Sequence, residues 1–130
     1  MQYKQKDNLE IVRQTSGVIP TLPFFEVKNS ILGKKYNLSL SFITESKMRT
    51  LSKQHKGSYN HMNTLAFELE KDSGEIVMNL QTIRSEAKEH NRKYLEHLIF
   101  LFIHSSLHLK GYSHGEAMEK LEDKYFKKFN

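Results

Sequence analysis

The 130-residue chain contains no cysteine. The absence of thiols excludes disulfide scaffolds, thiolate zinc fingers, iron–sulfur clusters and cysteine nucleophiles. Long hydrophobic runs are also missing, because the longest, residues 98–103, is far shorter than the ~20 residues of a membrane span. The first ten residues lack the apolar segment of a secretory signal. We therefore expect a cytoplasmic protein with no membrane partner.

The residues that are present have the composition of a globular protein. Hydrophobic residues make up 38% of the chain, charged residues 27% and aromatic residues 11%. A chain of this length forms one domain, residues 1–130, with a single core. The formal net charge of +5 favours an anionic partner such as nucleic acid. Many basic proteins bind no nucleic acid, so the charge alone leaves this point open.

Hydrophobic periodicity predicts strands followed by helices, without internal repeats. Four strands are expected, at residues 9–14, 37–43, 64–69 and 75–80, and turn residues at 71–74 join the last two as an antiparallel hairpin. Five helices are expected, at residues 23–32, 44–56, 82–90, 93–109 and 116–129. Thr44 and Thr82 are the expected N-caps of the second and third helices. This pattern predicts an α+β fold.

The fourth predicted helix is apolar on nearly every face, which is typical of the buried centre of a domain. His104 and His108 lie four residues apart on it, so their side chains share one face. Gly111 allows the chain to leave the helix in a left-handed conformation, and His114 can then return to the same point. Three imidazoles with an open fourth position are typical of a catalytic zinc site.

The other four histidines have simpler interpretations. A lone histidine on an apolar helix is more often a core residue than a ligand, and this is our interpretation of His97. We expect the remaining three, His55, His61 and His90, to lie on the surface.

The spacing H-x-x-x-H-x-x-G-x-x-H is also that of metzincin proteases. In those enzymes a glutamate follows the first histidine and acts as the general base. Ser105 occupies that position here, and a serine hydroxyl does not accept a proton near neutral pH. The sequence therefore argues against proteolysis.

Residues 104–114, HSSLHLKGYSH, resemble the motif H-G-x-L-H-L-x-G-Y-D-H of the YbeY family of bacterial endoribonucleases. Weaker similarities occur in the same order at residues 51–57, 63–67, 74–77 and 85–91. The sequence departs from the family pattern at several positions. Lys56 stands at the family's arginine, Ser113 at its aspartate, and Phe100 where a histidine is usual.

The resemblance implies a small mixed four-stranded sheet packed with about five helices, the central hydrophobic helix carrying the histidines. It also implies one zinc ion per chain, held by His104, His108 and His114, and cleavage of single-stranded RNA in ribosomal RNA maturation and ribosome quality control. Ribosomal RNA and ribosomal subunits would be the partners, with no DNA expected. Lys56 is the candidate catalytic residue, because its charge can hold a backbone phosphate beside the metal.

Two other functions remain open at this point. A ribosome-associated assembly factor with a residual or structural metal would fit the basic charge and the departures from the motif. A small zinc hydrolase with a non-RNA substrate would fit the histidine pattern alone.

Overall fold

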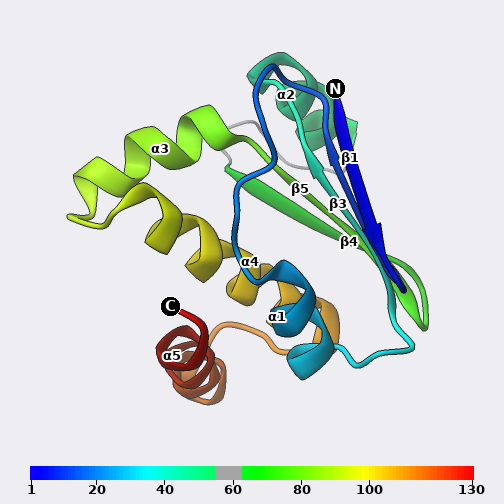
Figure 1. Cartoon of the computed structure of the whole chain (residues 1–130). Helices are drawn as coiled ribbons and strands as arrows, with labels where there is room; N and C mark the ends of the chain where they lie inside the picture. Colours follow the sequence, from blue (N-terminus) through cyan, green and yellow to red (C-terminus); the bar gives the residue numbers. More distant parts are fainter. Residues whose placement is uncertain (55–62) are drawn as a thin grey trace.

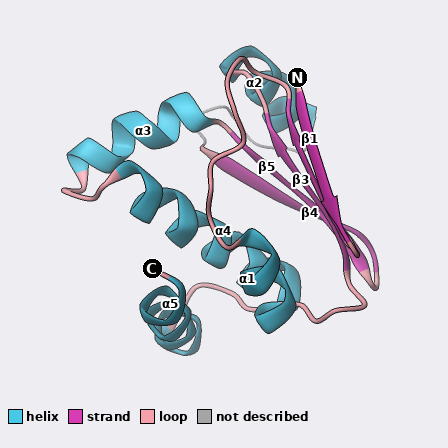
Figure 2. Ribbon diagram, in the orientation of Figure 1, coloured by secondary structure: helices cyan, strands magenta, loops and turns pink. Residues whose placement is uncertain are grey.

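The computed structural model of the chain describes residues 1–54 and 63–130. Figures 1 and 2 show a sheet with most of the helices gathered beside one of its faces. The strands are β1 (Gln2–Lys6), β2 (Leu9–Arg13), β3 (Asn37–Phe42), β4 (Thr64–Glu70) and β5 (Ser73–Met78). The helices are α1 (Phe24–Ile31), α2 (Glu45–Gln54), α3 (Leu80–Glu89), α4 (Tyr94–Lys110) and α5 (Glu116–Phe129). The α+β fold predicted from the sequence is confirmed.

The sheet is mixed, and its strands have the order β1-β2-β3-β5-β4. The three inner strands are parallel, with Leu40 of β3 opposite Ile11 of β2 and Ile76 of β5. The two outer strands are antiparallel to their neighbours, and β4 and β5 form the predicted hairpin. The buried side chains of β3 and β5 alternate with less buried ones at the start of each strand, as the two-residue period of a strand requires.

The sheet has one strand more than the four expected. All five side chains of β1 are exposed, so its sequence QYKQK has no apolar alternation to reveal it. The strand forms because its backbone pairs with β2 across a tight turn in which Asp7 has a φ of 48°. Pairing with a neighbouring strand thus decides the conformation of a segment that carries no sequence signal of its own.

The core lies between the sheet and helices α1, α3 and α4. The Phe24 ring of α1 is 5.0 Å from the Phe102 ring of α4 and 6.0 Å from the Phe42 ring of β3, measured between centroids. Helix α2 packs on the opposite face, where Met48 lies in a smaller apolar cluster with Ile43 and Val77. The main core therefore fixes the position of α4, the helix that carries two of the three histidines.

Helix α4 is the buried centre of the domain, as its sequence predicts. It packs against α1, α3, α5 and strand β4. It ends at Gly111, whose φ of 115° lies in the region that favours glycine. Within the described ranges, no helix is long and apolar enough to cross a membrane.

The two predicted N-caps have different outcomes. Thr44 caps α2, because its Oγ1 accepts a hydrogen bond of 3.1 Å from the backbone N–H of Lys47. The prediction for Thr82 is wrong, because α3 begins at Leu80 and its N-cap is Asn79, whose Oδ1 accepts from the N–H groups of Gln81 and Thr82. Strand β5 ends at Met78, two residues before its expected end, which leaves Asn79 free to begin the helix.

Candidate metal centre

Three histidine side chains meet at the C-terminal end of α4. His104 and His108 lie one turn apart on the helix, and their Nε2 atoms are 3.0 Å from each other. His114 follows the turn at Gly111 and brings its ring to 5.1 Å from that of His104 and 4.8 Å from that of His108, between centroids. One nitrogen from each ring can be chosen so that all three lie within 4.8 Å of one another. The cluster could hold a metal ion.

The other ring nitrogens of His104 and His108 already have partners. Nδ1 of His104 contacts the carboxylate of Glu122 on α5, and Nδ1 of His108 lies 3.0 Å from the backbone carbonyl oxygen of Tyr112. Both partners are acceptors, so each Nδ1 carries the proton and each Nε2 presents a lone pair.

Two lone pairs that face each other at 3.0 Å repel unless a cation lies between them. Tetrahedral nitrogens bonded to one zinc ion lie about 3.3 Å apart, given Zn–N bonds of 2.0–2.1 Å, and the Nε2 atoms of His104 and His108 are close to that separation. The donor set therefore fits a zinc ion.

The electrostatics of the cluster also favour metal binding. Burial is the main cause that lowers the pKa of His108. The hydrogen bond to the Tyr112 carbonyl opposes it, and the neighbouring His104 and His114 lower the pKa further. A lowered pKa keeps the imidazole neutral at neutral pH, which is the form that binds metals.

Comparison with known proteins gives the family. The family model described as Endoribonuclease YbeY matches residues 2–130. The chain belongs to the YbeY endoribonuclease family. It is 33% identical to the Endoribonuclease YbeY of Neorickettsia sennetsu, over 74% of this chain and 75% of that protein. It is 29% identical to that of Francisella philomiragia, over 88% of this chain and 86% of the relative.

A solved structure shares the fold. The solution structure of a Thermotoga maritima protein superimposes with a TM-score of 0.64 and 24% identity, covering 92% of this chain and 87% of that one. The similarity inferred from the residue 104–114 motif is thus confirmed, and the chain lies within the family over nearly its whole length.

Phe100 lies one turn before His104 on α4. The two rings are stacked with centroids 6.4 Å apart, and the ring of Phe126 on α5 meets Phe100 edge-on at 5.9 Å. The Arg92 guanidinium lies 4.3 Å from the centroid of Phe100. Aromatic rings and the Arg92 guanidinium therefore lie next to the histidine cluster, around Phe100 of α4.

His97 lies near the N-terminal end of α4, in a separate polar cluster. It is buried, as predicted, with Nδ1 3.3 Å from Arg92 and Nε2 3.8 Å from the carboxylate of Glu86. Glu86 in turn accepts hydrogen bonds from the side-chain amide of Asn63, just before β4. These contacts tie the first residue after the undescribed segment to α3 and α4.

The remaining predicted residues have mixed outcomes. Ser105, at the position of the metzincin base, is buried, with 3% of its surface exposed. Its side chain is a hydroxyl and not a carboxylate. His90 is exposed, as predicted. Lys56, His55 and His61 lie outside the described residues.

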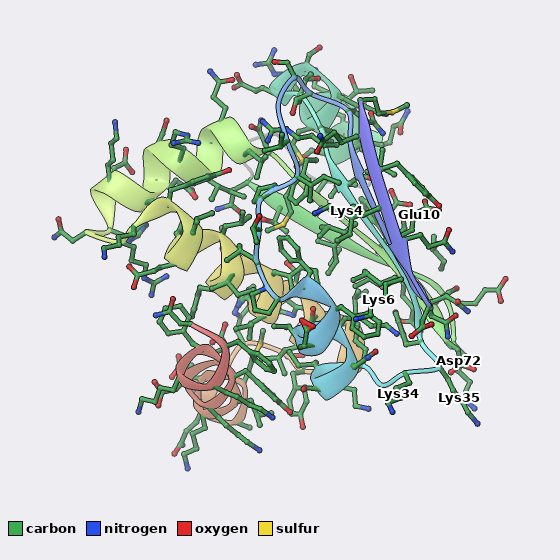
Figure 3. The ribbon with its side chains drawn as sticks, in the orientation of Figure 1. Lys4, Lys6, Glu10, Lys34, Lys35 and Asp72 are labelled. Carbon is green, nitrogen blue, oxygen red and sulfur yellow. The ribbon has the colours of Figure 1, made fainter. Side chains whose placement is uncertain are left out.

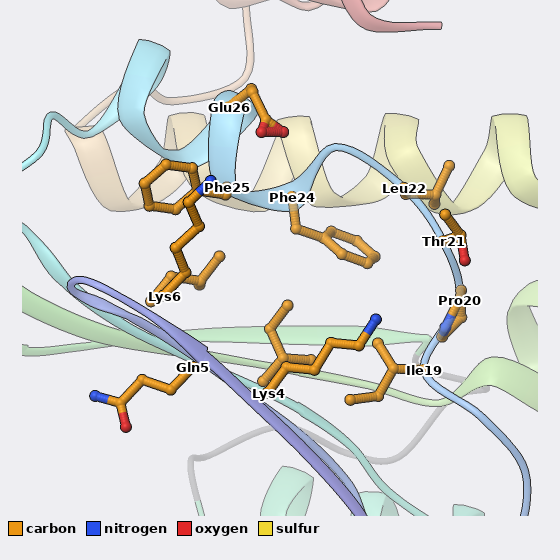
Figure 4. Close-up of a pocket in the computed structure, with 12 residues that line it drawn as sticks. Lys4, Gln5, Lys6, Ile19, Pro20, Thr21, Leu22, Phe24, Phe25 and Glu26 are labelled. Carbon is orange, nitrogen blue, oxygen red and sulfur yellow. The ribbon is translucent and has the colours of Figure 1, made fainter.

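An apolar cavity lies away from the histidines. It measures about 440 Å³ and opens between β1 and α1, lined by apolar side chains such as Ile11, Ile19 and Phe24, with Lys4 at its edge (Figure 4). None of its lining residues belongs to α4 or to residues 111–115. The cavity is therefore separate from the candidate metal centre.

Two lysines lie beside an acidic residue at one end of the sheet. Lys34 and Lys35 lie in the loop before β3, far along the sheet from α3, and the acidic Asp72 is their neighbour in the view (Figure 3).

The contact of Glu122 with His104 was not predicted from the sequence. A signal was present, because Glu122 falls between Met118 and Tyr125 on the apolar face of α5, at a helical spacing that predicts a hydrophobic residue. The Tyr112 carbonyl carries no sequence signal, because any residue there supplies the same backbone oxygen.

Proposed function

We propose that this chain is a zinc-dependent endoribonuclease that cuts single-stranded RNA in ribosomal RNA maturation and ribosome quality control in the cytoplasm. One zinc ion per chain would be held by His104, His108 and His114. The observation that carries the proposal is the 3.0 Å distance between Nε2 of His104 and Nε2 of His108. The Nδ1 atom of each ring already has a hydrogen-bond partner, and a third imidazole lies beside the pair. Membership of the YbeY family supplies the reaction class.

The chain's own residues have distinct roles in this proposal. The three histidines bind the ion, and the Tyr112 carbonyl holds the ring of His108 so that Nε2 points inward. The bound ion supplies Lewis-acid chemistry next to a phosphodiester. Partial burial of His104 and His108 limits the access of water and strengthens the electrostatic interactions at this end of α4.

Lys56 is the proposed catalytic residue of this chain. Its positive charge would hold a backbone phosphate near the metal. A lysine keeps the charge of the family's arginine but lacks the planar fork that grips two phosphate oxygens. We therefore expect Lys56→Arg to preserve or improve cleavage without changing metal content.

The direct test combines metal analysis with RNA cleavage. We expect about one zinc ion per chain, cleavage of single-stranded ribosomal RNA fragments that stops with a chelator, and recovery when zinc is added. The double variant His104→Ala, His108→Ala should lose both metal and cleavage, whereas His90→Ala, an exposed histidine, should keep both. Unchanged zinc content in the double variant would refute the metal assignment.

We expect no peptidase activity, because Ser105 replaces the glutamate that serves metzincins as a base. Purified protein loaded with zinc should leave casein and peptide substrates intact. Hydrolysis that disappears in His108→Ala would contradict this prediction.

Two alternative functions predict other outcomes of the same measurements. A ribosome-associated assembly factor would keep its ribosome association after loss of the histidines and would show no nuclease activity. A small zinc hydrolase with a non-RNA substrate would bind zinc and leave RNA intact. Membership of the endoribonuclease family favours the first proposal over both.

A further inference from the structure

Glu122 is an unusual residue on α5. The helix packs with its apolar face against α4, and Glu122 lies on that face with only 8% of its surface exposed. Its carboxylate contacts Nδ1 of His104, and in the described part of the chain this is its only ion-pair contact. The other acids of α5, such as Glu119 and Asp123, are exposed.

A buried carboxylate is costly unless positive charge lies nearby. A metal-binding imidazole is neutral, so it offers a hydrogen bond to Glu122 but no charge of its own. A divalent ion on Nε2 of His104 would supply that charge through the ring. A metal ion held by the histidine cluster would thus explain why the Glu122 carboxylate is buried beside it.

We propose that Glu122 is a positioning residue for the metal. It holds the proton of His104 on Nδ1 and fixes the ring so that Nε2 faces His108 and His114. The carboxylate also makes the imidazole a stronger ligand, as acceptors behind zinc-binding histidines do in general. This inference rests on the proposed zinc site and adds that α5 takes part in it.

The test measures zinc affinity by competition with a chromophoric chelator, using the full chain. Glu122→Ala should bind zinc about 10–100-fold more weakly than the wild type. Glu122→Gln should show a smaller loss, because its amide oxygen can still accept the hydrogen bond. Glu119→Gln is the matched control, since it removes one exposed negative charge three residues away, and it should keep wild-type affinity.

A second measurement separates positioning from a general loss of structure. Cobalt(II) replaces zinc and reports ligand geometry in its visible spectrum, so the spectrum of Glu122→Gln should change while that of Glu119→Gln should not. Thermal unfolding with a chelator present checks that the variants fold. If Glu122→Ala does not fold, Glu122→Gln decides: affinity and spectrum equal to those of Glu119→Gln would overturn the proposal.

The outcomes distinguish this inference from the proposed function. Wild-type protein that binds zinc through His104, with unaltered affinity in the Glu122 variants, would overturn the role of Glu122 alone. Wild-type protein that binds no zinc would overturn both.

Discussion

At the scale of single residues, His97 shows how the fold acts on an ionisable group. Burial is the main cause that lowers the pKa of His97, and the guanidinium of Arg92 adds to it, while Glu86 acts in the opposite direction. The folded protein therefore holds this imidazole neutral at a pH where the unfolded chain would already protonate it.

This lowered pKa predicts a pH-dependent stability. As the pH falls below the ordinary histidine pKa of about 6.5, the unfolded state binds a proton first, so the free energy of unfolding decreases. His97→Gln should show a flatter decrease between pH 7.5 and 5.5, measured by urea unfolding with a chelator present to exclude metal effects. Parallel curves for the variant and the wild type would contradict the prediction.

The sequence predicted the three clustered histidines and the buried state of His97, because helical spacing alone places them. It could not predict the partners of Nδ1 in His104 and His108. Glu122 comes from another helix and Tyr112 contributes a backbone oxygen, so both contacts depend on tertiary packing. Lys56 stays a prediction.

At the scale of elements, the start of α3 provides a clear comparison of two candidate caps. Asn79→Ala removes the side-chain oxygen that accepts from two N–H groups and should lower the free energy of unfolding by about 1 kcal/mol. Thr82→Ala lies inside the helix and should change it by less than about 0.5 kcal/mol. Urea unfolding measures both, and an equal loss in the two variants would show that Asn79 is not the cap.

The glycine at the end of α4 allows effects on stability to be distinguished from effects on metal binding. Gly111 and Gly33 have φ values of 115° and 94°, and an added Cβ would meet nothing within 4 Å at either position. An alanine at each site should therefore cost about 1–3 kcal/mol of backbone strain.

Only Gly111→Ala should also weaken zinc binding, because the Tyr112 carbonyl and His114 follow directly after that turn. Gly33→Ala introduces the same strain just after α1, outside residues 104–114, and serves as the control. Chelator competition measures the affinity, and equal zinc affinity in both variants would argue that the turn does not position His114.

Elements with an apolar period were predictable, and those without one were not. The sequence located α1, α4, α5 and the four strands β2–β5, because each carries a repeated set of apolar side chains. It missed β1, whose exposed residues pair with β2 but carry no apolar alternation. It placed the start of α3 too late because Leu80 also fits the apolar pattern of the preceding strand.

At the scale of the whole molecule, the net charge of +5 bears on RNA binding. Each neutralised phosphate of a single strand contributes a slope of about −0.7 to the logarithm of affinity against the logarithm of salt concentration. Lys56→Ala should flatten this dependence by about that amount and weaken binding to unrelated RNA sequences alike.

Lys35→Ala is a suitable control, since Lys35 is an exposed lysine in the loop before β3, outside the segment that contains Lys56. It removes the same charge and should leave the slope near that of the wild type. Fluorescence anisotropy at several salt concentrations measures both variants. An unchanged slope in Lys56→Ala would refute the proposed phosphate contact.

The three histidines span only residues 104–114, whereas the parallel pairs β2–β3 and β3–β5 join distant parts of the chain. Loops of about ten residues close within 10–100 ns, far faster than such strands assemble. In an unfolded chain, the three histidines can therefore meet before the distant strands pair. An ion that also binds the unfolded chain stabilises the native state less than its affinity suggests, so a high zinc affinity would be no measure of this protein's resistance to unfolding.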